Sequence, residues 1–261
     1  MSKEIKLPTF RLDGKTAIVT GATKGIGYAI AATFAAYGAN VVITSRTPAD
    51  CARCAAELTG AGGSCIGIAA NSARKEEIDT VIAAAEERFG RVDILVNNAG
   101  ISGETAPLLK QTEENFDKVI AVNLKGVFLF AQAAAGKMAA DGQGGRIINI
   151  ASVGGLIGGK GVAPYGASKA GVISLTKTMA NEWARYGITV NAVCPGYVVT
   201  ELNREFFADP AFKEKMERRT AVRRLGTVEE VAGPVLALAS DCFSYMTGTT
   251  LLLDGGQTIG G

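Results

Sequence analysis

The sequence has 261 residues, of which 48% are hydrophobic and 20% are charged, and its formal net charge is +2. This length suits one α/β domain with a full core, and the weak charge argues against nucleic acid or an anionic membrane surface as a partner. The charged N-terminal segment is expected to be neither a signal peptide nor an anchor, and no stretch nears the ~18 uncharged apolar residues of a membrane span. The chain is therefore predicted to be cytoplasmic.

Short apolar segments alternate with longer amphipathic ones along the whole chain, which predicts alternating strands and helices. Strands are expected at residues 16–20, 40–45, 64–70, 92–98, 146–152, 188–195 and 249–254. Helices are expected at residues 25–38, 48–60, a segment ending near 89, 112–139, 164–186 and 228–239.

The expected strands lack polar alternation, which indicates that both faces of the sheet are covered, as in a parallel sheet. Right-handed crossovers would then give an α/β fold with a doubly wound, Rossmann-type sheet of about seven strands. The sequence contains no linker or break in composition. Residues 1–261 are therefore predicted to form a single domain.

Five cysteines in a chain with no export signal are expected to be reduced thiols. Cys51 and Cys54 form a CxxC pair, but no second pair and no histidine could complete a zinc site with them. We expect this pair on an exposed helix and interpret its spacing as chance, so no metal is predicted.

Ligands of an open parallel sheet bind outside the carboxyl ends of its strands. In this chain those ends are rich in glycine, asparagine, serine and threonine, which favours a polar binding site along that edge. The segments concerned are residues 20–27, 44–47, 69–72, 97–100, 149–152 and 194–200.

The segment TGATKGIG joins the first expected strand to the first expected helix. Gly21, Gly25 and Gly27 would form a tight turn that lets a pyrophosphate approach the amide groups of the helix N-terminus. The position after the first strand of an alternating sheet favours a dinucleotide site over an ordinary connecting turn. Further contacts to the cofactor are expected from Thr23, Lys24 and Ile26.

The end of the second strand indicates which dinucleotide is bound. NAD sites usually carry an acidic residue there for the ribose 2′-hydroxyl, whereas this chain has Ser45 followed by Arg46. An arginine can bind a 2′-phosphate by charge and a forked hydrogen bond, and Lys24 could reach the same group. The sequence therefore predicts NADP(H), although both cations could also be ordinary surface residues.

Five motifs in order give the chain its resemblance to a known family. They are TGATKGIG, NNAG at 97–100, the asparagine of VNLKG (Asn123), Ser152 thirteen residues before YGASK (165–169), and the PG pair at 195–196. Together they cover nearly the whole chain, and the sequence resembles a short-chain dehydrogenase/reductase. That resemblance implies an oxidoreductase that interconverts a small-molecule ketone and a secondary alcohol by hydride transfer.

The chain has no histidine, so another group must carry the proton. A tyrosine has a pKa of about 10, and we expect Lys169, four residues after Tyr165 on the same helix face, to lower it. Tyr165 would then act as general acid in reduction and general base in oxidation. Ser152 would hold the substrate oxygen. The resemblance also implies that Lys169 binds ribose hydroxyls and that Asn123 positions a water in a proton relay.

The remaining cofactor contacts follow from the resemblance less sharply. Asn71 is expected near the adenine, where many relatives have an aspartate. Asn98, Ala99 and Gly100 are expected beside the riboses, although Asn98 could instead brace the centre of the sheet. The nicotinamide is expected to lie against Pro195, Gly196, Val198 and Thr200, and Thr200 could alternatively cap a helix.

The least regular segment, residues 197–225, is predicted to be a substrate-binding lid, with the glycine-rich loop 154–164 as a second pocket wall. The lid contains aromatic residues that could be apolar contacts (Tyr197, Phe206, Phe207, Phe212). It also contains arginines, most of which we expect on a solvated helix face because acids interleave with them (204, 218, 219, 223, 224).

Several substrates remain open at this point. The C-terminal part resembles gluconate 5-dehydrogenase-like members, which implies a keto-sugar acid or a polyol. A 3-oxoacyl reductase is an alternative, although Gln143 and Tyr186 stand where carrier-dependent relatives tend to have arginines. A hydroxysteroid dehydrogenase is a third possibility. A non-catalytic NADP(H)-sensing Rossmann protein would need the glycine turn but not the Ser152, Tyr165 and Lys169 set.

Helices 112–139 and 164–186 are apolar on more than one face, which favours burial against another subunit. The glycine-rich C-terminal segment would suit a close interface. The family resemblance implies a homotetramer.

Overall fold

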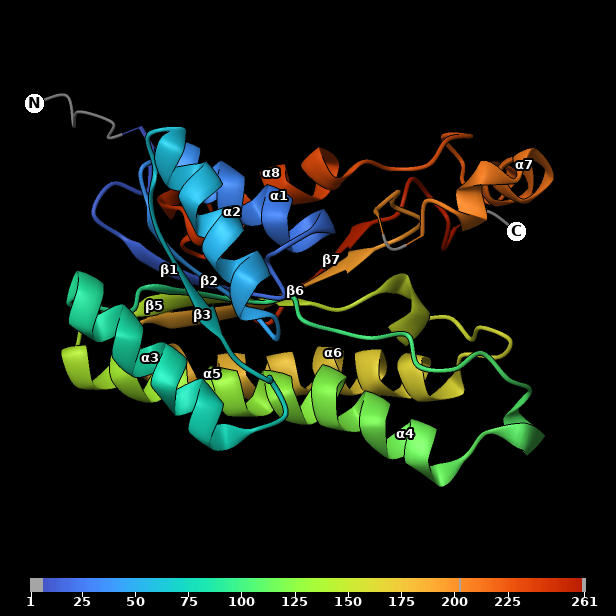
Figure 1. Cartoon of the computed structure of the whole chain (residues 1–261), viewed down its shortest axis with the longest axis horizontal. Coiled ribbons are helices and arrows are strands. Elements are labelled where there is room, and N and C mark those ends of the chain that lie inside the picture. Colours follow the sequence, from blue (N-terminus) through green and yellow to red (C-terminus); the bar gives the residue numbers. More distant parts are fainter. Residues whose placement is uncertain (1–6, 202, 260–261) are drawn as a thin grey trace, which may run out of the picture.

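Seven parallel strands form one sheet in the computed structural model, which describes residues 7–201 and 203–259 (Figure 1). The strand order is β3-β2-β1-β4-β5-β6-β7. The strands are β1 (Thr16–Thr20), β2 (Asn40–Ser45), β3 (Ser64–Ala69), β4 (Ile94–Asn97), β5 (Gly145–Ile150), β6 (Ile188–Pro195) and β7 (Thr250–Leu253). The predicted fold class and all seven predicted strands are confirmed.

Helices cover both faces of the sheet, with α1, α2 and α8 on one side and α3 to α6 on the other (Figure 1). Helix α7 projects beyond one end of the sheet. The helices are α1 (Gly25–Ala36), α2 (Pro48–Gly60), α3 (Lys75–Phe89), α4 (Glu113–Ile120), α5 (Gly126–Asp141), α6 (Ala163–Trp183), α7 (Pro210–Arg218) and α8 (Val228–Ala239).

Successive side chains of a strand point to opposite faces of a sheet, and here both faces are hydrophobic. Val19 of β1 packs in the core layer under α1 and α8, whereas its neighbour Ile18 packs in the layer with α3 and α5. This double burial explains the missing polar alternation in the sequence.

The strand order reverses at β1, which is paired with both β2 and β4. In open α/β sheets the crevice for a ligand lies outside the carboxyl ends of the strands at this switch point. The glycine-rich segment after β1 and the NNAG segment after β4 therefore meet there.

The helix predicted at 112–139 contains a π turn, Ala121–Lys125, between α4 and α5. By length and composition alone the whole helix, Glu113–Asp141, would be long and apolar enough to cross a membrane. Lys125 and Lys137 interrupt its apolar run, so the helix does not contradict the prediction that no uncharged apolar stretch nears the length of a membrane span. In the fold, 44% of its apolar window is buried, and α5 packs against the sheet, α3 and α6. Part of its apolar surface therefore belongs to the core.

The expectation that Cys51 and Cys54 lie on an exposed helix surface is also wrong, because both side chains are fully buried. Helix α2 turns this face toward β2 and β3. The thiol of Cys54 donates to the Thr23 carbonyl (3.4 Å), and Cys51 lies near the Ile68 carbonyl (3.7 Å). Within residues 7–201 and 203–259, no cluster of three metal-ligating residues occurs.

Candidate active site

The glycine turn after β1 is shaped by close backbone packing. A Cβ on Gly27 would lie 2.4 Å from both Asn98 Nδ2 and the Gly21 carbonyl, and one on Gly21 would lie 2.8 Å from Ala99 Cα. Gly25 has a φ of +56°, which favours glycine, and a Cβ added there would lie 3.5 Å from Thr200 Cβ. These contacts bring residues 21–27, 98–99 and Thr200 together, as predicted.

The N-terminus of α1 has no side-chain cap and no acidic residue in its first turn. Helix N-termini are normally capped by a side chain because their first amide groups lack partners within the helix. An uncapped N-terminus beside a glycine turn suits an anionic pyrophosphate. The site therefore fits a dinucleotide, which would lie over the turn with its pyrophosphate on these amides.

Asn98 braces the sheet, which was one of the two roles considered for it. Its Nδ2 donates to the carbonyls of Thr20 (2.9 Å) and Gly21 (3.0 Å). The hydroxyl of Thr20 in turn accepts hydrogen bonds from the amides of Asn98 (2.9 Å) and Ala99 (3.0 Å). Sequence reasoning missed Thr20, whose position as the last residue of a buried strand was the available signal.

Two exposed cations lie at the adenosine end of the expected site. Within the described part of the chain, Lys24 and Arg46 make no ion pair. The hydroxyl of Ser45 is 3.3 Å from the thiol of Cys51. Asn71 uses its side-chain oxygen locally, to accept the amide of Ala73 (3.0 Å), which leaves its amide nitrogen and the second lone pair of that oxygen for an adenine.

Ser152 follows β5 and begins a short 3₁₀ turn, Val153–Gly155. Its hydroxyl accepts the amide of Gly154 (3.0 Å). Gly154 and Gly155 let this turn pack on α6, because an added Cβ would lie 3.3 Å from the Tyr165 ring and 2.7 Å from the Lys169 carbonyl carbon. These two glycines thus bring Ser152 close to α6.

Tyr165 and Lys169 lie on one face of α6, with the Lys169 ammonium 5.7 Å from the centre of the tyrosine ring. The Lys169 Nζ donates to the Ile150 carbonyl at 2.7 Å. Gly100 lies next to it, since a Cβ there would be 3.5 Å from Nζ. The predicted set of Ser152, Tyr165 and Lys169 is therefore gathered at the end of β5.

The expected lowering of the tyrosine pKa is not found in the chain by itself. Burial raises the pKa of Tyr165 above its usual 10.0, although the Ser152 hydroxyl lowers it in part. Burial also lowers the pKa of Lys169 from 10.5 to about 8. Below pH 8 Lys169 stays mostly charged, 5.7 Å from the tyrosine ring, but its charge does not offset the effect of burial on the pKa of Tyr165. The positive charge of an oxidised nicotinamide would be a second source of stabilisation for the phenolate.

Asn123 lies in the π turn between α4 and α5 and is fully buried. Its side-chain oxygen accepts the amide of Ile101 (2.8 Å), and its Nδ2 donates to the Ile101 carbonyl (2.9 Å) and the Ser168 hydroxyl (3.1 Å). Ser168 in turn donates to the main-chain carbonyl of Tyr165 (2.7 Å). The amide thus ties the π turn to the catalytic helix. Sequence reasoning missed Ser168, although it lies inside the YGASK motif.

The segment after β6 runs along the same edge of the sheet. The amide of Gly196 donates to the Leu253 carbonyl of β7 (3.0 Å). Val198 is buried in the hydrophobic core, so its side chain is not exposed along this edge. The amide of Thr200 donates to Asn203 Oδ1 (2.7 Å), and the alternative that Thr200 caps a helix is not observed.

The two loops on the substrate side are joined by a polar contact that the sequence analysis missed. The Gln111 amide nitrogen donates to the carbonyls of Ala106 (3.0 Å) and Gly161 (3.2 Å), which lie on different loops. Asn115 holds Gln111 in turn, because its Nδ2 donates to Gln111 Oε1 (2.7 Å). Loop 154–164 is therefore anchored to the loop after β4.

All five arginines of the lid are exposed, as expected for a solvated face, and two of them form ion pairs. Arg218 pairs with Glu214 (2.5 Å), and Arg224 pairs with Glu230 through both of its terminal nitrogens. The rings of Phe207 and Phe212 are 5.8 Å apart. The side chain of Phe206 lies outside the described part of the structure.

A doubly wound sheet with an uncapped glycine turn at its switch point, and a Ser–Tyr–Lys set beside it, defines a nicotinamide dinucleotide oxidoreductase. A family model described as enoyl-(acyl carrier protein) reductase, of the short-chain alcohol dehydrogenase type, matches residues 21–258. The chain belongs to the short-chain dehydrogenase/reductase family.

Similar proteins cover almost the whole chain and act on several substrates. A 3-oxoacyl-[acyl-carrier-protein] reductase of Synechocystis is 43% identical over 95% of this chain and 98% of its own length. A 3beta-hydroxysteroid dehydrogenase of Eggerthella lenta is 43% identical over 95% of each chain. The structure of a gluconate 5-dehydrogenase from Burkholderia cenocepacia, in complex with NADP and tartrate, matches with a TM-score of 0.91 at 41% identity, over 96% of this chain and 97% of that one.

These findings confirm the predicted family and reaction class. The chain is an oxidoreductase that acts on CH–OH and carbonyl groups of a small-molecule substrate. Because relatives with different substrates have similar identities, overall similarity does not select among them.

Proposed function

We propose that this protein is an NADP(H)-dependent reductase or dehydrogenase of a keto-sugar acid or polyol, with Tyr165 as general acid and base. The observation that carries the proposal is the meeting of Ser152, Tyr165 and Lys169 at the end of β5. When bound, the nicotinamide supplies or accepts the hydride.

The protein residues hold the substrate oxygen and move its proton. Ser152 donates a hydrogen bond to that oxygen, and the Tyr165 hydroxyl gives it a proton in reduction and takes one in oxidation. Burial favours the protonated phenol of Tyr165, which suits the acid role. Lys169, with a pKa of about 8, is able to return a proton to Tyr165 near neutral pH. Since the Asn123 amide is occupied, any relay water would bind a main-chain carbonyl of its π turn.

The preference for NADP(H) rests on charge. Arg46 follows β2 and Lys24 lies in the glycine turn, and no acidic residue of the described chain pairs with either. An arginine and a lysine stabilise a 2′-phosphate, whereas a carboxylate at Ser45 would repel it. We expect Arg46→Ala to weaken NADPH binding by roughly tenfold or more while NADH binding changes little, as suits the loss of one charged hydrogen bond.

An anionic sugar acid suits the residues on the two sides of the expected pocket. Lys160 of loop 154–164 and Arg204 of the lid are exposed, and within residues 7–201 and 203–259 neither has an acidic partner. A carboxylate between two free cations would be stabilised by both. The likeness to a gluconate 5-dehydrogenase supports the same class.

A carrier-bound 3-oxoacyl substrate is the second candidate. Tyr186 stands where carrier-dependent relatives tend to have an arginine, but the neighbouring Arg185 guanidinium lies 4.7 Å from its ring and supplies a cation at the same surface. The high identity to a 3-oxoacyl reductase supports this candidate.

The test is a panel of carbonyl substrates, followed by the loss of NADPH absorbance with NADH in parallel. The panel comprises 5-ketogluconate, neutral keto-sugars, a 3-oxoacyl thioester and keto-steroids. Turnover of 5-ketogluconate with NADPH, weakened in Lys160→Ala or Arg204→Ala, supports the proposal. Turnover of the thioester or steroid alone overturns the substrate class. Binding of NADPH with no turnover across the panel would favour a cofactor sensor.

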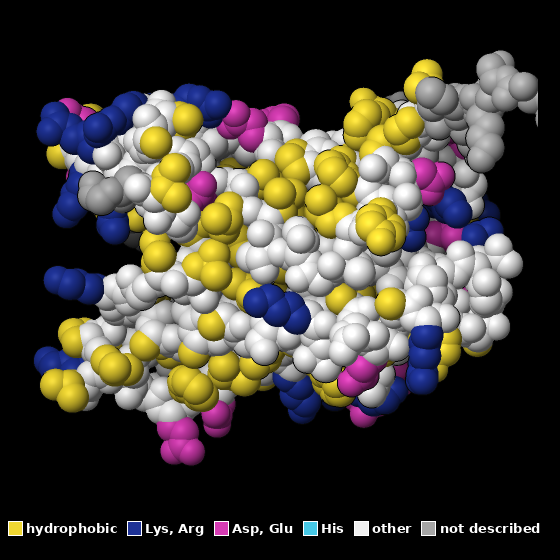
Figure 2. Space-filling model, turned by 180° about the vertical axis from the view of Figure 1, so that it is seen from behind, with side chains coloured by type: hydrophobic (Ala, Val, Ile, Leu, Met, Phe, Trp, Pro, Cys, Tyr) yellow, Lys and Arg dark blue, Asp and Glu magenta, His cyan; other side chains and the backbone are white. Residues whose placement is uncertain are grey.

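We also propose that the single domain, with residues 197–225 as its lid, assembles as a cytoplasmic homotetramer. Hydrophobic side chains gather in patches on the face shown in Figure 2. Phe116 of α4 and Phe128 of α5 are 44% and 41% exposed, and Leu252 of the edge strand β7 is 41% exposed. Apolar patches of this kind favour contact with another subunit. A monomeric mass in light scattering at working concentration would contradict the assembly.

A further inference from the structure

The lid is joined to the rest of the protein at two points. Val198 and Gly226 form an isolated parallel bridge, with hydrogen bonds from the Gly226 amide to the Tyr197 carbonyl (2.9 Å) and from the Val199 amide to the Gly226 carbonyl (3.1 Å). This bridge closes the lid into a loop, and buried Val198 anchors the base of that loop in the hydrophobic core.

The C-terminal tail, residues 254–259, folds around one carboxylate. Asp254 Oδ1 accepts the amide of Gly256 (3.0 Å), and its Oδ2 accepts both the amide and the hydroxyl of Thr258 (2.8 Å each). Gly255 and Gly256 have φ values of +58° and +79°, which the turn requires. Hydrogen bonds to an ionised group are roughly twice as strong as neutral ones, so ionised Asp254 sets the shape of the tail.

This folded tail contacts both ends of the lid. At the first end, a Cβ on Gly196 would lie 2.8 Å from both Asp254 Cα and Gln257 Oε1, so the backbone passes directly against the tail. At the second end, the amide of Val222 donates to the Gly255 carbonyl (3.1 Å). A Cβ on Gly256 would lie 2.6 Å from Ala221 Cβ. The C-terminal tail thus packs between the two ends of the lid.

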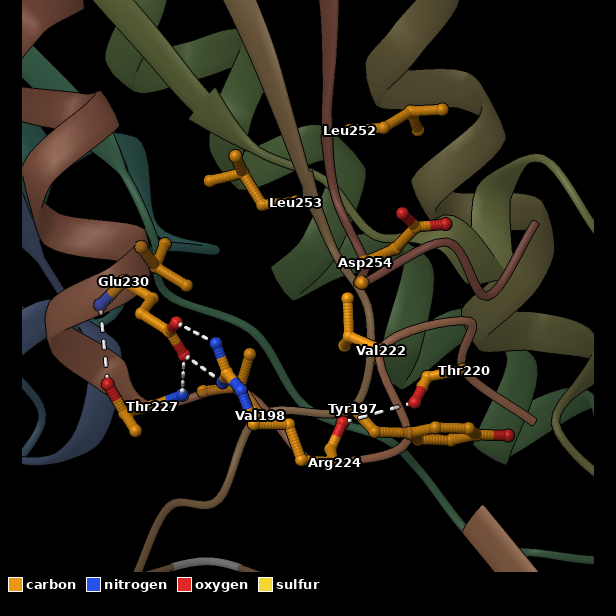
Figure 3. A pocket seen from close by; sticks show the side chains of 13 residues that line it. Tyr197, Val198, Thr220, Val222, Arg224, Thr227, Glu230, Leu252, Leu253 and Asp254 are labelled. Atoms are coloured by element: carbon orange, nitrogen blue, oxygen red, sulfur yellow. Dashed lines mark hydrogen bonds and ion pairs between the residues drawn. The ribbon is translucent and has the colours of Figure 1, made fainter. Parts of the chain in front are cut away.

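A cavity of about 380 Å³ separates this contact from the lid bridge. Figure 3 shows Asp254 above Val222 and Tyr197, with the Arg224–Glu230 pair across the pocket. The tail contact lies across this space from the buried base of the lid at Val198 and is a second support for the lid.

We propose that Asp254 is a positioning residue for the substrate: by folding the tail against both ends of the lid, it orients the lid over the Ser152–Tyr165 site. The inference rests on the proposed function, in which the lid binds the substrate. The glycines of the tail, which the sequence suggested as an interface feature, are then required by the lid contact.

The test compares Asp254→Asn with wild type and with Asp241→Asn, a change at an exposed residue of the same C-terminal region. An asparagine would turn an amide group toward the N–H groups of Gly256 or Thr258, so the tail should lose its turn. We expect hydrogen exchange at residues 197–226 to rise roughly tenfold, with the glycine turn 20–27 unchanged. With 5-ketogluconate, KM should rise at least about fivefold, while kcat and the Kd for NADPH stay within about twofold.

A milder variant guards against simple misfolding. Thr258→Val removes one of the donors to Asp254 and should give an intermediate rise in lid exchange without a change in Tm beyond that of Asp241→Asn. Unchanged lid exchange in both variants would overturn the inference and leave the proposed function intact. Faster exchange across the whole chain would reduce Asp254 to a general structural role and overturn it too. Faster lid exchange in a protein that turns over no carbonyl substrate would support the lid contact and contradict the proposed function.

Discussion

The glycine turn and the lid meet at Gly25 and Thr200, but they are held in different ways. The turn is braced by Asn98 and Thr20, and its backbone touches the segment after β4 so closely that a Cβ on Gly27 has no room. The lid is held at its two ends, and most of its ion pairs are on the surface. The cofactor end is therefore preformed, whereas the substrate end is adjustable, as suits a family with many substrates.

The largest effect, a loss of turnover, is expected from a change at Tyr165, next to the preformed cofactor end of the site. Tyr165→Phe removes the proton donor but keeps the ring that packs on Gly154, so turnover should fall by about 10²–10⁴-fold. The Kd for NADPH, measured by fluorescence, should stay within about twofold because the ring remains. Near-normal turnover would exclude Tyr165 as the acid and base.

The next prediction tests the rigidity of the glycine turn. Gly27→Ala would push a methyl group against Asn98 Nδ2 and the Gly21 carbonyl, and should lower the free energy of unfolding by about 1–3 kcal/mol. NADPH binding should weaken with it. The matched control is Gly60→Ala at the end of α2, where nothing lies within 4 Å of the added Cβ. Equal unfolding midpoints in urea for the two variants would show that the turn is not tightly packed.

Lys169 should carry a stability cost at neutral pH. The difference between 10.5 and about 8 corresponds to roughly 3 kcal/mol against the charged form in the folded state. Because the unfolded chain binds more protons between pH 8 and 10.5, this cost is full below pH 8 and is relieved as the pH rises.

Lys169→Met should therefore abolish most activity. Its free energy of unfolding at pH 7 should nevertheless be about 1–2 kcal/mol higher than that of wild type, after the lost hydrogen bond to the Ile150 carbonyl is allowed for. The difference in the free energy of unfolding between this variant and wild type should shrink as the pH rises from 8 to 10.5. Thermal melts across this range measure the difference. A variant that is less stable than wild type at every pH would contradict the buried-charge argument.

The smallest effect is expected on the lid surface. The Arg218–Glu214 pair is exposed, with 71% and 62% of the two side chains accessible. Glu214→Ala should change the free energy of unfolding by less than about 0.5 kcal/mol, because exposed ion pairs contribute little. A loss as large as that of Gly27→Ala would mean that the lid is held by its surface charges rather than by its ends.

Much of the fold could be predicted because its signals are local. Buried apolar runs such as 16–20 and 40–45 matched their strands residue for residue, since a strand covered on both faces has no polar interruption. The π turn at Asn123 could not be predicted, because α4 and α5 have the same helical periodicity on either side of it. The burial of Cys51 and Cys54 was missed because cysteine side chains on a short amphipathic helix can face either the sheet or the solvent.

The candidate site, like the fold, could be predicted from the sequence only in part. The sequence by itself determined the order of the motifs, and the motifs indicated the family. They also located the glycine turn and the set of Ser152, Tyr165 and Lys169. These were predictable because spacing along a strand or a helix fixes which side chains share an edge or a face. Only the tertiary structure decided that Asn98 braces the sheet, that burial raises the pKa of Tyr165, and that the tail around Asp254 touches both ends of the lid. Those properties arise from contacts between segments far apart in the chain, and no local pattern records them.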